Sequence, residues 1–428
     1  MSVARDSSCG TPDPLAAPRS VCVLGLGYIG LATAAMLASR DFRVLGVDIK
    51  PHIVEAVNRG VSHIEDPGLD PLIRETVAAG ALRARDRPEP SDAFIIAVPT
   101  PVRSDGNHTP DLGYVYAALD DLLPVLRPGN LVILESTSPV GTTRELAGRI
   151  RAARPDLRPP LPGEPSPNLY LAYCPERIIP GRMLAELGEN DRIIGGMDAI
   201  SSALAHAVYS RVSSGICHSS DDRTAEMVKL VENAYRDVNI AFANELSILC
   251  RGLGLDAFNV IALANRHPRV SILRPGPGVG GHCIAVDPWF IVSSDRKNSR
   301  LIAAARAVND AKPDIVVEDI VAAAGGQDGA VLCLGLTYKE NVGDFRESPA
   351  LAIARAVTAR LGARVLCVDE FADHGPEALQ ATGGLRLVSL EDGLARAGIV
   401  ALLVGHDRFR GLALRPDQIL LDVVGLLG

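Results

Sequence analysis

One cysteine inside a glycine-rich segment is a candidate nucleophile. Residues 276–290 read GPGVGGHCIAVDPWF, which places Cys283 among glycines and Asp287 four residues after it. A thiolate in such a loop could attack a carbonyl carbon and form a covalent intermediate, because sulfur is strongly nucleophilic. The alternative is a small residue that only fills a tight turn, and this stretch alone leaves both interpretations open.

A long helix carries the next polar side chains that could do chemistry. Residues 222–254 contain no proline, and no glycine before Gly252, which predicts one long helix. Lys229, Asn233 and Arg236 recur at helical spacing, roughly opposite an apolar stripe. The stripe consists of Val231, Tyr235, Val238, Phe242, Leu246 and Leu249. The polar row is either a solvated surface or the border of a cleft, and the stripe could pack against a second subunit.

A glycine-rich turn near the start of the chain predicts a dinucleotide site. Residues 20–48 read as strand, turn, helix and strand, with Gly25, Gly27 and Gly30 forming GxGxxG and Asp48 ending the second strand. Such glycines let the backbone approach a pyrophosphate, which then lies at the helix N-terminus. Asp48 would accept hydrogen bonds from a ribose hydroxyl and repel a 2′-phosphate, which favours NAD over NADP. The alternative is a glycine turn that binds no dinucleotide.

Two further apolar segments extend this first unit. Residues 92–100 and 131–137 read as buried strands that end in Thr100 and Thr137. In a doubly wound sheet the carboxyl ends of the strands line the ligand crevice, so both threonines are candidate cofactor contacts. The alternative is that they only cap the helices that follow.

A second α/β unit begins near residue 329. The turn after its first strand reads GLTYKENVGDFRESP and therefore lacks the GxGxxG pattern. Lys339 and Arg346 could hold a phosphate there, and Tyr338 could offer a ring or a hydroxyl. The alternative is an ordinary solvated turn.

The bulk composition excludes several classes of protein. With 428 residues, 47% hydrophobic and 22% charged, the chain is expected to be a soluble globular protein of two or three domains. A net charge of −8 argues against nucleic acid as a partner. No apolar run is long enough to span a membrane, and residues 1–18 do not resemble a signal peptide. The eight cysteines include no CxxC pair, which argues against a zinc site or a disulfide framework and favours a reducing, cytoplasmic compartment.

Six motifs in register give the chain a resemblance to a known family. They are GLGYIG at 25–30, STSPVGTT at 136–143, YCPERIIPGR at 173–182, EMVKLVENAYRDVNIAFANE at 226–245, GVGGHC at 278–283 and GLTYKENVGDFRESPA at 335–350. In this order they resemble the UDP-glucose/GDP-mannose dehydrogenase family, from about Ser20 to the end of the chain. The sequence GGHCIAVDPWF and Arg236 are similar to those of the branch that oxidises UDP-N-acetyl-D-mannosamine. The UDP-glucose branch usually has GGSC in place of GGHC.

The resemblance implies an NAD-dependent, four-electron oxidation of the C6 hydroxymethyl group of a UDP-sugar. The substrate would be UDP-N-acetyl-D-mannosamine and the product its uronate. Two hydride transfers are needed, and Cys283 would trap the intermediate aldehyde as a thiohemiacetal that becomes a thioester. Lys229 and Asn233 would act on the C6 oxygen, and Glu176 or Asp287 would activate the hydrolytic water. Each of these two carboxylates has a structural alternative, a pairing with Arg177 or a backbone amide.

The resemblance also assigns binding residues. The NAD contacts would be Gly25, Gly27, Tyr28, Ile29, Gly30, Asp48, Thr100, Thr137 and Arg346. The UDP-sugar contacts would be Arg177, Ile178, Lys229, Asn233, Arg236, His267, Arg269, Gly280, Tyr338 and Lys339. Thr137 would also orient the catalytic water. In a homodimer Arg269, or nearby Arg266, would reach the partner's sugar; the alternative for His267 and Arg269 is an ordinary loop histidine and surface arginine. No metal is expected.

The predicted fold class is α/β, with two Rossmann-like doubly wound sheets joined by a long central helix. Four segments are expected: a disordered extension at 1–18, an NAD-binding domain at 19–215, a central helical and dimerisation domain with the cysteine loop at 216–315, and a C-terminal UDP-sugar-binding domain at 316–428.

Three rival functions are compatible with parts of this pattern. The same chemistry could act on UDP-N-acetylglucosamine, UDP-glucose or another nucleotide sugar. A non-catalytic nucleotide-sugar sensor is disfavoured because Cys283, Lys229, Asn233 and Asp287 are all present. A two-electron hydroxyacid dehydrogenase would need neither the thiol nor the second α/β sheet.

Overall fold

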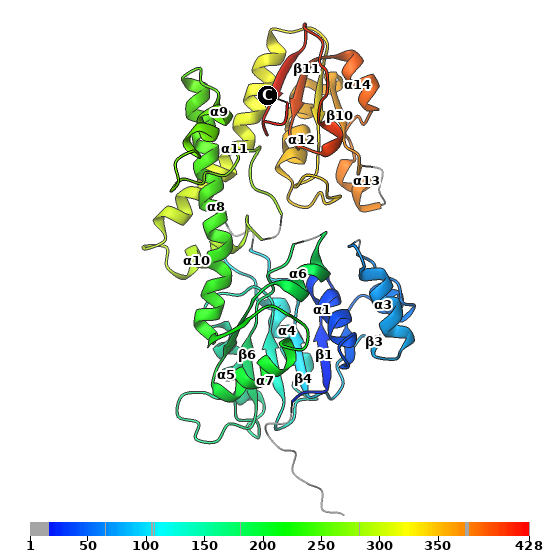
Figure 1. Cartoon of the computed structure of the whole chain (residues 1–428), viewed down its shortest axis with the longest axis vertical. Helices are drawn as coiled ribbons and strands as arrows, with labels where there is room; N and C mark the ends of the chain where they lie inside the picture. The colour runs from blue at the N-terminus through cyan, green and yellow to red at the C-terminus, as the bar shows by residue number, and fades with distance from the viewer. Residues whose placement is uncertain are drawn as a thin grey trace, which may run out of the picture. The chain divides into compact units, whose positions relative to one another are not determined.

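The computed structural model describes the chain as two compact units, and their boundary falls inside one helix, between Leu230 and Val231. The structure describes residues 17–64, 66–103, 106, 108–179, 181–281, 283–372 and 376–427 (Figure 1). The side chains of residues 376, 377 and 379 are not described. Nearly all of the predicted disordered extension at 1–18 therefore lies outside the described residues. The predicted division into four segments stays a prediction.

The first unit contains an eight-stranded sheet in the order β3-β2-β1-β4-β5-β6-β7-β8. Its strands are β1 (Ser20–Leu24), β2 (Arg43–Val47), β3 (Leu82–Arg85), β4 (Ala93–Ile96), β5 (Leu131–Leu134), β6 (Tyr170–Tyr173), β7 (Arg192–Gly196) and β8 (Cys217–Asp221). All neighbouring strands are parallel except β6 and β7. The strand order reverses between β1 and β4, and this switch point is where doubly wound sheets bind their ligands.

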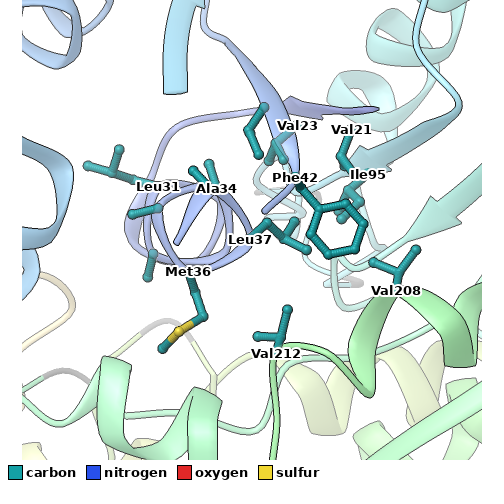
Figure 2. Packing of buried hydrophobic residues seen from close by; sticks show 14 of the residues in the cluster. Val21, Val23, Leu31, Ala34, Met36, Leu37, Phe42, Ile95, Val208 and Val212 are labelled. Atoms are coloured by element: carbon teal, nitrogen blue, oxygen red, sulfur yellow. The ribbon is translucent and has the colours of Figure 1, made fainter. Parts of the chain in front are cut away.

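Helices cover both faces of this sheet. They are α1 (Tyr28–Ala38), α2 (Pro51–Asn58), α3 (Leu69–Ala78), α4 (Gly113–Leu122), α5 (Thr142–Ala153), α6 (Met183–Glu189) and α7 (Ala199–Tyr209). Alternate residues of β1 enter different hydrophobic clusters because successive side chains of a strand point to opposite faces. Val21 and Val23 pack in one cluster with Leu37 and Phe42 (Figure 2). Cys22 and Leu24 join the cluster of the other face. Burial on both faces explains why the inner strands β1, β4 and β5 are almost continuously apolar.

The predicted long helix is α8 (Asp222–Gly252). In the second unit it is followed by α9 (Ala257–Ala264), α10 (Asp287–Ser294) and α11 (Arg300–Gly325). A parallel sheet in the order β10-β9-β11-β12 comes next. Its strands are β9 (Ala330–Leu334), β10 (Val365–Val368), β11 (Ala397–Leu402) and β12 (Ile419–Asp422), with α12 (Pro349–Leu361), α13 (Pro376–Thr382), α14 (Leu390–Arg396) and the short 3-10 helices η1 (Gly362–Arg364) and η2 (Asp407–Phe409). The α/β fold with two doubly wound sheets and a long helix between them is confirmed.

The surface of α8 reverses the usual distribution of side chains. Tyr235, Phe242 and Leu249 of the apolar stripe are 66%, 52% and 56% exposed. Lys229 and Asn233 of the polar row are instead buried, at 6% and 8% exposed. The interpretation of the polar row as a solvated surface is therefore wrong for these two residues.

Candidate active site

The first glycine turn fits a dinucleotide. Gly25 has a φ of +90°, and an added Cβ would lie 2.6 Å from the carbonyl oxygen of Ala97. A Cβ on Gly30 would lie 1.8 Å from the oxygen of Gly25, so neither position accepts a side chain. A Cβ on Gly27, the N-cap of α1, would meet nothing within 4 Å. The turn thus leaves open space at a helix N-terminus, where backbone N–H groups and the helix dipole bind a phosphate.

Asp48 is held beside this turn by backbone hydrogen bonds. Its Oδ2 accepts the N–H of Leu26 at 3.0 Å, and its Oδ1 accepts the N–H of Lys50 at 2.9 Å. Each carboxylate oxygen can accept a second hydrogen bond, so a ribose hydroxyl could still bind. Tyr28 and Ile29 form the first turn of α1 and are half-buried. These residues fit NAD.

Thr100 and Thr137 lie in loops beyond β4 and β5, because both strands end earlier than predicted. Both residues are half-buried. The N-cap of α4 is Leu112 and that of α5 is Gly141, so neither threonine caps the helix that follows its strand. The capping alternative is therefore wrong.

A buried ion pair follows β6. Lys229 Nζ lies 2.7 Å from Oε1 of Glu176 and also donates to the backbone oxygen of Glu176 at 3.0 Å. The other carboxylate oxygen accepts the N–H of Ile178 at 2.9 Å. Arg177 is half-buried and donates from Nη1 to the backbone oxygen of Asp191 at 3.1 Å. The first unit thus brings together Glu176 and Lys229, which are both predicted catalytic residues.

Glu135 is a buried carboxyl group in the first unit that the sequence analysis missed. It follows β5, and its oxygens accept hydrogen bonds from Thr33 Oγ1 at 3.2 Å and from Tyr209 OH at 3.3 Å. Burial raises the pKa of Glu135 to about 7; Arg192, 3.6 Å away, opposes this rise, and Glu176 adds to it. An acidic residue at the end of an apolar strand was a visible signal for this site.

In the second unit, the cysteine loop leads into α10. The backbone oxygen of Cys283 accepts the N–H groups of Val286 at 3.0 Å and Asp287 at 2.9 Å. Asp287 is 2% exposed, and its Oδ2 accepts a hydrogen bond from Asn233 Nδ2 at 2.6 Å. The structure therefore brings together two predicted catalytic residues, Asn233 and Asp287, at the helix that begins four residues after the thiol.

Cys283 differs from the other cysteines that the structure describes. It is exposed, whereas Cys217 is half-buried and the others are buried: Cys22, Cys174, Cys250, Cys333 and Cys367. Burial raises the pKa of Cys22 to about 12, which leaves that thiol protonated and unreactive. Cys283 is thus the described thiol with the readiest access to a substrate.

The glycines before Cys283 are required by close packing. A Cβ on Gly280 would lie 2.4 Å from the oxygen of Glu347 and 3.0 Å from Cβ of Tyr338. Gly281 has a φ of +81°, and its Cβ would meet the Tyr338 ring at 3.0 Å. The cysteine loop therefore lies directly against the turn that carries Tyr338.

That second turn has the same backbone plan as the first. Gly335 has a φ of +85°. Asp369 follows β10 and accepts the N–H of Leu336 at 2.6 Å and that of Phe371 at 2.8 Å, as Asp48 does in the first unit. Thr337, which is buried, stands where the first turn has its second glycine. The bare backbone cradle of the first turn is thus absent here.

The remaining predicted contacts lie in the second unit. Tyr338 and Lys339 are half-buried on the turn. The Arg346 guanidinium binds the buried Asp344 carboxylate in a bidentate pair, with Nε–Oδ1 at 2.9 Å and Nη2–Oδ2 at 2.5 Å. The structure thus shows Arg346 bound to a carboxylate beside the second turn.

Arg236, His267 and Arg269 are exposed, as is Arg266. His267 Nδ1 accepts the N–H of Arg269 at 3.3 Å. Within the described residues there is no cluster of three His, Cys, Asp or Glu side chains that could hold a metal ion. The same part of the chain has no helix of sufficient length and apolarity to cross a membrane.

Comparisons with known proteins cover most of the chain. Residues 19–213 match the NAD binding domain of the UDP-glucose/GDP-mannose dehydrogenase family, residues 223–311 its central domain and residues 332–427 its UDP binding domain. An NDP-N-acetyl-D-galactosaminuronic acid dehydrogenase of Ralstonia nicotianae is 52% identical over 92% of this chain and 92% of its own length. A UDP-N-acetyl-D-mannosamine dehydrogenase of Salmonella typhi is 48% identical over 92% of this chain and 95% of its own. A solved UDP-N-acetyl-mannosamine dehydrogenase of S. aureus is 38% identical, with a TM-score of 0.80 over 92% of this chain and 91% of that one.

Proposed function

The chain belongs to the UDP-glucose/GDP-mannose dehydrogenase family, and we propose that it oxidises C6 of UDP-N-acetyl-D-mannosamine to the uronate through a covalent thioester. It is an NAD-dependent enzyme. The observation that carries the proposal is the exposure of Cys283 in a chain whose other described thiols are buried or half-buried. The scattered cysteines also suit a reducing, cytoplasmic compartment.

The chemistry requires two oxidations at one carbon. NAD, bound at the first glycine turn, supplies the hydride acceptor for each. The first oxidation removes a hydride and a proton from the C6 hydroxymethyl group and leaves an aldehyde. The Cys283 thiolate adds to the aldehyde carbon, and the aldehyde oxygen takes up a proton, which gives a thiohemiacetal. Loss of the second hydride together with the hydroxyl proton then gives a thioester. Water cleaves the C–S bond, releasing the carboxylate and restoring the thiol.

The polar residues of α8 and their carboxylate partners support these steps. Lys229 and Asn233 stand one helical turn apart, and we assign them to the oxygen on C6, where an ammonium and an amide donor stabilise developing negative charge. Glu176 and Asp287 are held by Lys229 and Asn233 at 2.7 and 2.6 Å, and either could activate the hydrolytic water. Thr137 would orient that water.

The sugar is assigned to the N-acetylhexosamine class. The sequence GGHCIAVDPWF and Arg236 favour UDP-N-acetyl-D-mannosamine, and a relative at 48% identity carries that name. The 52% identical relative is named for a galactosaminuronic acid, so the galacto-configured sugar is the second candidate. Measuring NADH formation from UDP-N-acetylmannosamine, UDP-N-acetylgalactosamine, UDP-N-acetylglucosamine and UDP-glucose decides among them. We expect the first to have the highest kcat/KM; no NADH from any of them would overturn the function.

Replacing the thiol by a hydroxyl tests the covalent step. Cys283→Ser should bind NAD and substrate normally but turn over by about three orders of magnitude more slowly, because an alkoxide is hard to form near pH 7 and an ester hydrolyses more slowly than a thioester. NADH per sugar and the mass of the protein are measured together. Cys217→Ser is the matched control and should keep two NADH per sugar. A Cys283→Ser enzyme with near wild-type turnover would refute the thioester mechanism.

We further propose that the enzyme is a homodimer in which the exposed apolar stripe of α8 is covered by its partner. An apolar stripe this exposed in one chain is typical of an interface. Replacing Phe242 and Leu246 by glutamate should give monomers in sedimentation velocity, with little activity, because Arg269 or Arg266 would no longer reach the partner's sugar. Glu232→Ala, on the same helix, should remain dimeric. Fully active monomers would show that each subunit has a complete site.

A further inference from the structure

A buried histidine lies beside the second turn and has no role in the site described so far. His406 follows β11, directly before η2, and is 0% exposed. Its ring lies near those of Phe371 and Phe409, with centroids 5.5 and 5.6 Å away. Because buried ring nitrogens are costly without partners, both nitrogens of this imidazole need hydrogen bonds.

The partners of the ring fix its tautomer. Nδ1 faces the backbone N–H of Asn341 at 2.9 Å, and this group can only donate, so Nδ1 must accept. Nε2 therefore carries the hydrogen of the neutral ring and faces Thr337 Oγ1 at 3.2 Å and Asp369 Oδ2 at 3.3 Å. Glu370 Oε1 also lies 3.5 Å from Nδ1.

Asp369 supports this assignment because it is ionised. Burial alone would raise the pKa of Asp369, but the hydrogen bonds from His406 and from the N–H groups of Leu336 and Phe371 lower it below the ordinary value. An ionised carboxylate accepts hydrogen bonds, which agrees with the donor role of Nε2 that follows from the Asn341 N–H at Nδ1.

These bonds hold both ends of the segment 337–341. The Thr337 hydroxyl accepts from the imidazole and donates to the backbone oxygen of Lys339 at 2.9 Å. Asn341 has a φ of +57°, which is uncommon outside glycine, and its side chain exchanges two 3.0 Å hydrogen bonds with Asp407. Tyr338 and Lys339, the predicted substrate contacts, lie between the two fixed ends.

The same segment contacts the cysteine loop, because the Tyr338 ring is the nearest neighbour of the position where a Gly281 side chain would begin. We propose that His406 is a positioning residue: its imidazole fixes the turn that presents Tyr338 and Lys339 to the nucleotide sugar, and through Tyr338 it sets the loop that carries Cys283. The inference rests on the proposed function for the identity of the ligand.

The first test removes the hydrogen bonds and keeps the ring. His406→Phe should preserve packing against Phe371 and Phe409 but leave the Asn341 N–H without its acceptor and remove one donor from the Asp369 carboxylate. We expect KM for the UDP-sugar to rise about tenfold or more, because lost buried hydrogen bonds of this kind weaken an interaction to that extent. KM for NAD, which binds at the other turn, should not change.

Two further variants separate positioning from general stability. His406→Asn can still accept from the Asn341 N–H through its amide oxygen but cannot reach Thr337 and Asp369 as Nε2 does, so it should restore part of the substrate affinity. Thr337→Val keeps the volume of the side chain but removes the hydroxyl between His406 and Lys339. It should also raise KM for the UDP-sugar, and it decides the question if His406→Phe does not fold. In the double variant with His406→Phe, Thr337→Val should raise KM for the UDP-sugar little further, because both substitutions break the same hydrogen-bond network.

Two readouts complete the design. Iodoacetamide alkylation of Cys283, followed by mass spectrometry, should be slowed by UDP in the wild type, and UDP should protect less in His406→Phe. Calorimetric titration measures the affinity for UDP and needs no turnover. It therefore tests the positioning role even if the proposed reaction does not occur, so the two failures can be distinguished. Unchanged UDP affinity and unchanged alkylation in both His406→Phe and Thr337→Val would overturn the proposal. Equal rises in KM for NAD and for the UDP-sugar would also overturn it, because they indicate a purely structural role.

Discussion

The two glycine turns of this chain share one backbone plan and present different chemistry. Gly25 and Gly335 both have a positive φ, of +90° and +85°, and each donates its N–H to the last residue of the following strand, at 2.8 and 2.9 Å. In each unit an aspartate at the end of that strand, Asp48 or Asp369, accepts the next backbone N–H. The turn itself is therefore not what distinguishes a dinucleotide site.

The residues directly after the turn make the difference. Gly27 leaves open space, and α1 begins at once, so the backbone N–H groups of the helix N-terminus are open to a phosphate. Thr337 is buried in the corresponding position, and α12 begins only at Pro349. The longer segment allows Tyr338 and its neighbours to present side chains where the first turn presents bare backbone. One plan thus yields an anion cradle in one unit and a side-chain surface in the other.

Among changes to the two turns, the largest expected effect comes from placing a side chain in the open space at Gly27. Gly27→Leu should lower NAD affinity by about 100-fold or more, since the pyrophosphate could no longer approach the helix N-terminus. Its melting temperature should stay near that of the wild type, because a Cβ there meets nothing within 4 Å. NAD calorimetry and thermal unfolding check both expectations.

Two variants provide the contrast, Gly25→Ala and Thr337→Gly. Gly25→Ala should be strongly destabilised, because residue 25 has a φ of +90° and the added Cβ would lie 2.6 Å from the Ala97 oxygen. Thr337→Gly should gain no NAD binding, because no helix begins behind it. NAD binding at a second site in Thr337→Gly would contradict the comparison.

A smaller effect is expected from the two aspartates. The wild type should prefer NAD over NADP, because a 2′-phosphate would meet the Asp48 carboxylate. Asp48→Asn should reduce the ratio of the two kcat/KM values by about tenfold, a change of roughly 1.4 kcal/mol. Asp369→Asn should leave this ratio unchanged. Equal kcat/KM for NAD and NADP in the wild type would remove the role assigned to Asp48.

The smallest effect concerns the pH dependence of stability, because the pKa values of Glu135 in the first unit and Asp369 in the second shift in opposite directions. The pKa of Glu135 is raised to about 7 by burial, so the native state binds more protons than the unfolded state between pH 4.5 and 7, and stability falls as pH rises through this window. The pKa of Asp369 is lowered, so its contribution is present above 3.8 and is lost as pH falls further.

Urea unfolding midpoints at several pH values test both signs. Glu135→Gln should remove part of the decline between pH 4.5 and 7, and Asp369→Asn should reduce the loss of stability in acid. A Glu135→Gln midpoint that falls as steeply as that of the wild type would show that this carboxyl group does not titrate there.

The sequence predicted the fold because apolar runs and glycine turns are local signals. The strand ends were less predictable: β4 and β5 stop at Ile96 and Leu134, before the threonines that were expected to end them. Helical spacing placed Lys229 and Asn233 on one face but could not show their burial. Their partners lie 53 and 54 residues away in the chain, and only the folded structure brings them together.

The residues that the sequence analysis missed are those whose meaning depends on distant neighbours. Glu135 is visible as an acid after an apolar strand, but its bonds to Thr33 and Tyr209 span 102 and 74 residues. His406 stands in an ordinary strand-to-turn segment, 65 residues from Asn341. No local pattern distinguishes such a histidine from one on the surface.

The close fit of Gly280 against Glu347 and Tyr338 limits how this chain could be recombined with its relatives. A chimera that receives a foreign C-terminal domain would place an unrelated turn against the native cysteine loop. A shift of this loop by a few tenths of an ångström would displace the thiol. Exchange of sugar-nucleotide preference by domain grafting should therefore succeed only when the crossover lies before residue 276, so that loop and turn are inherited from one parent.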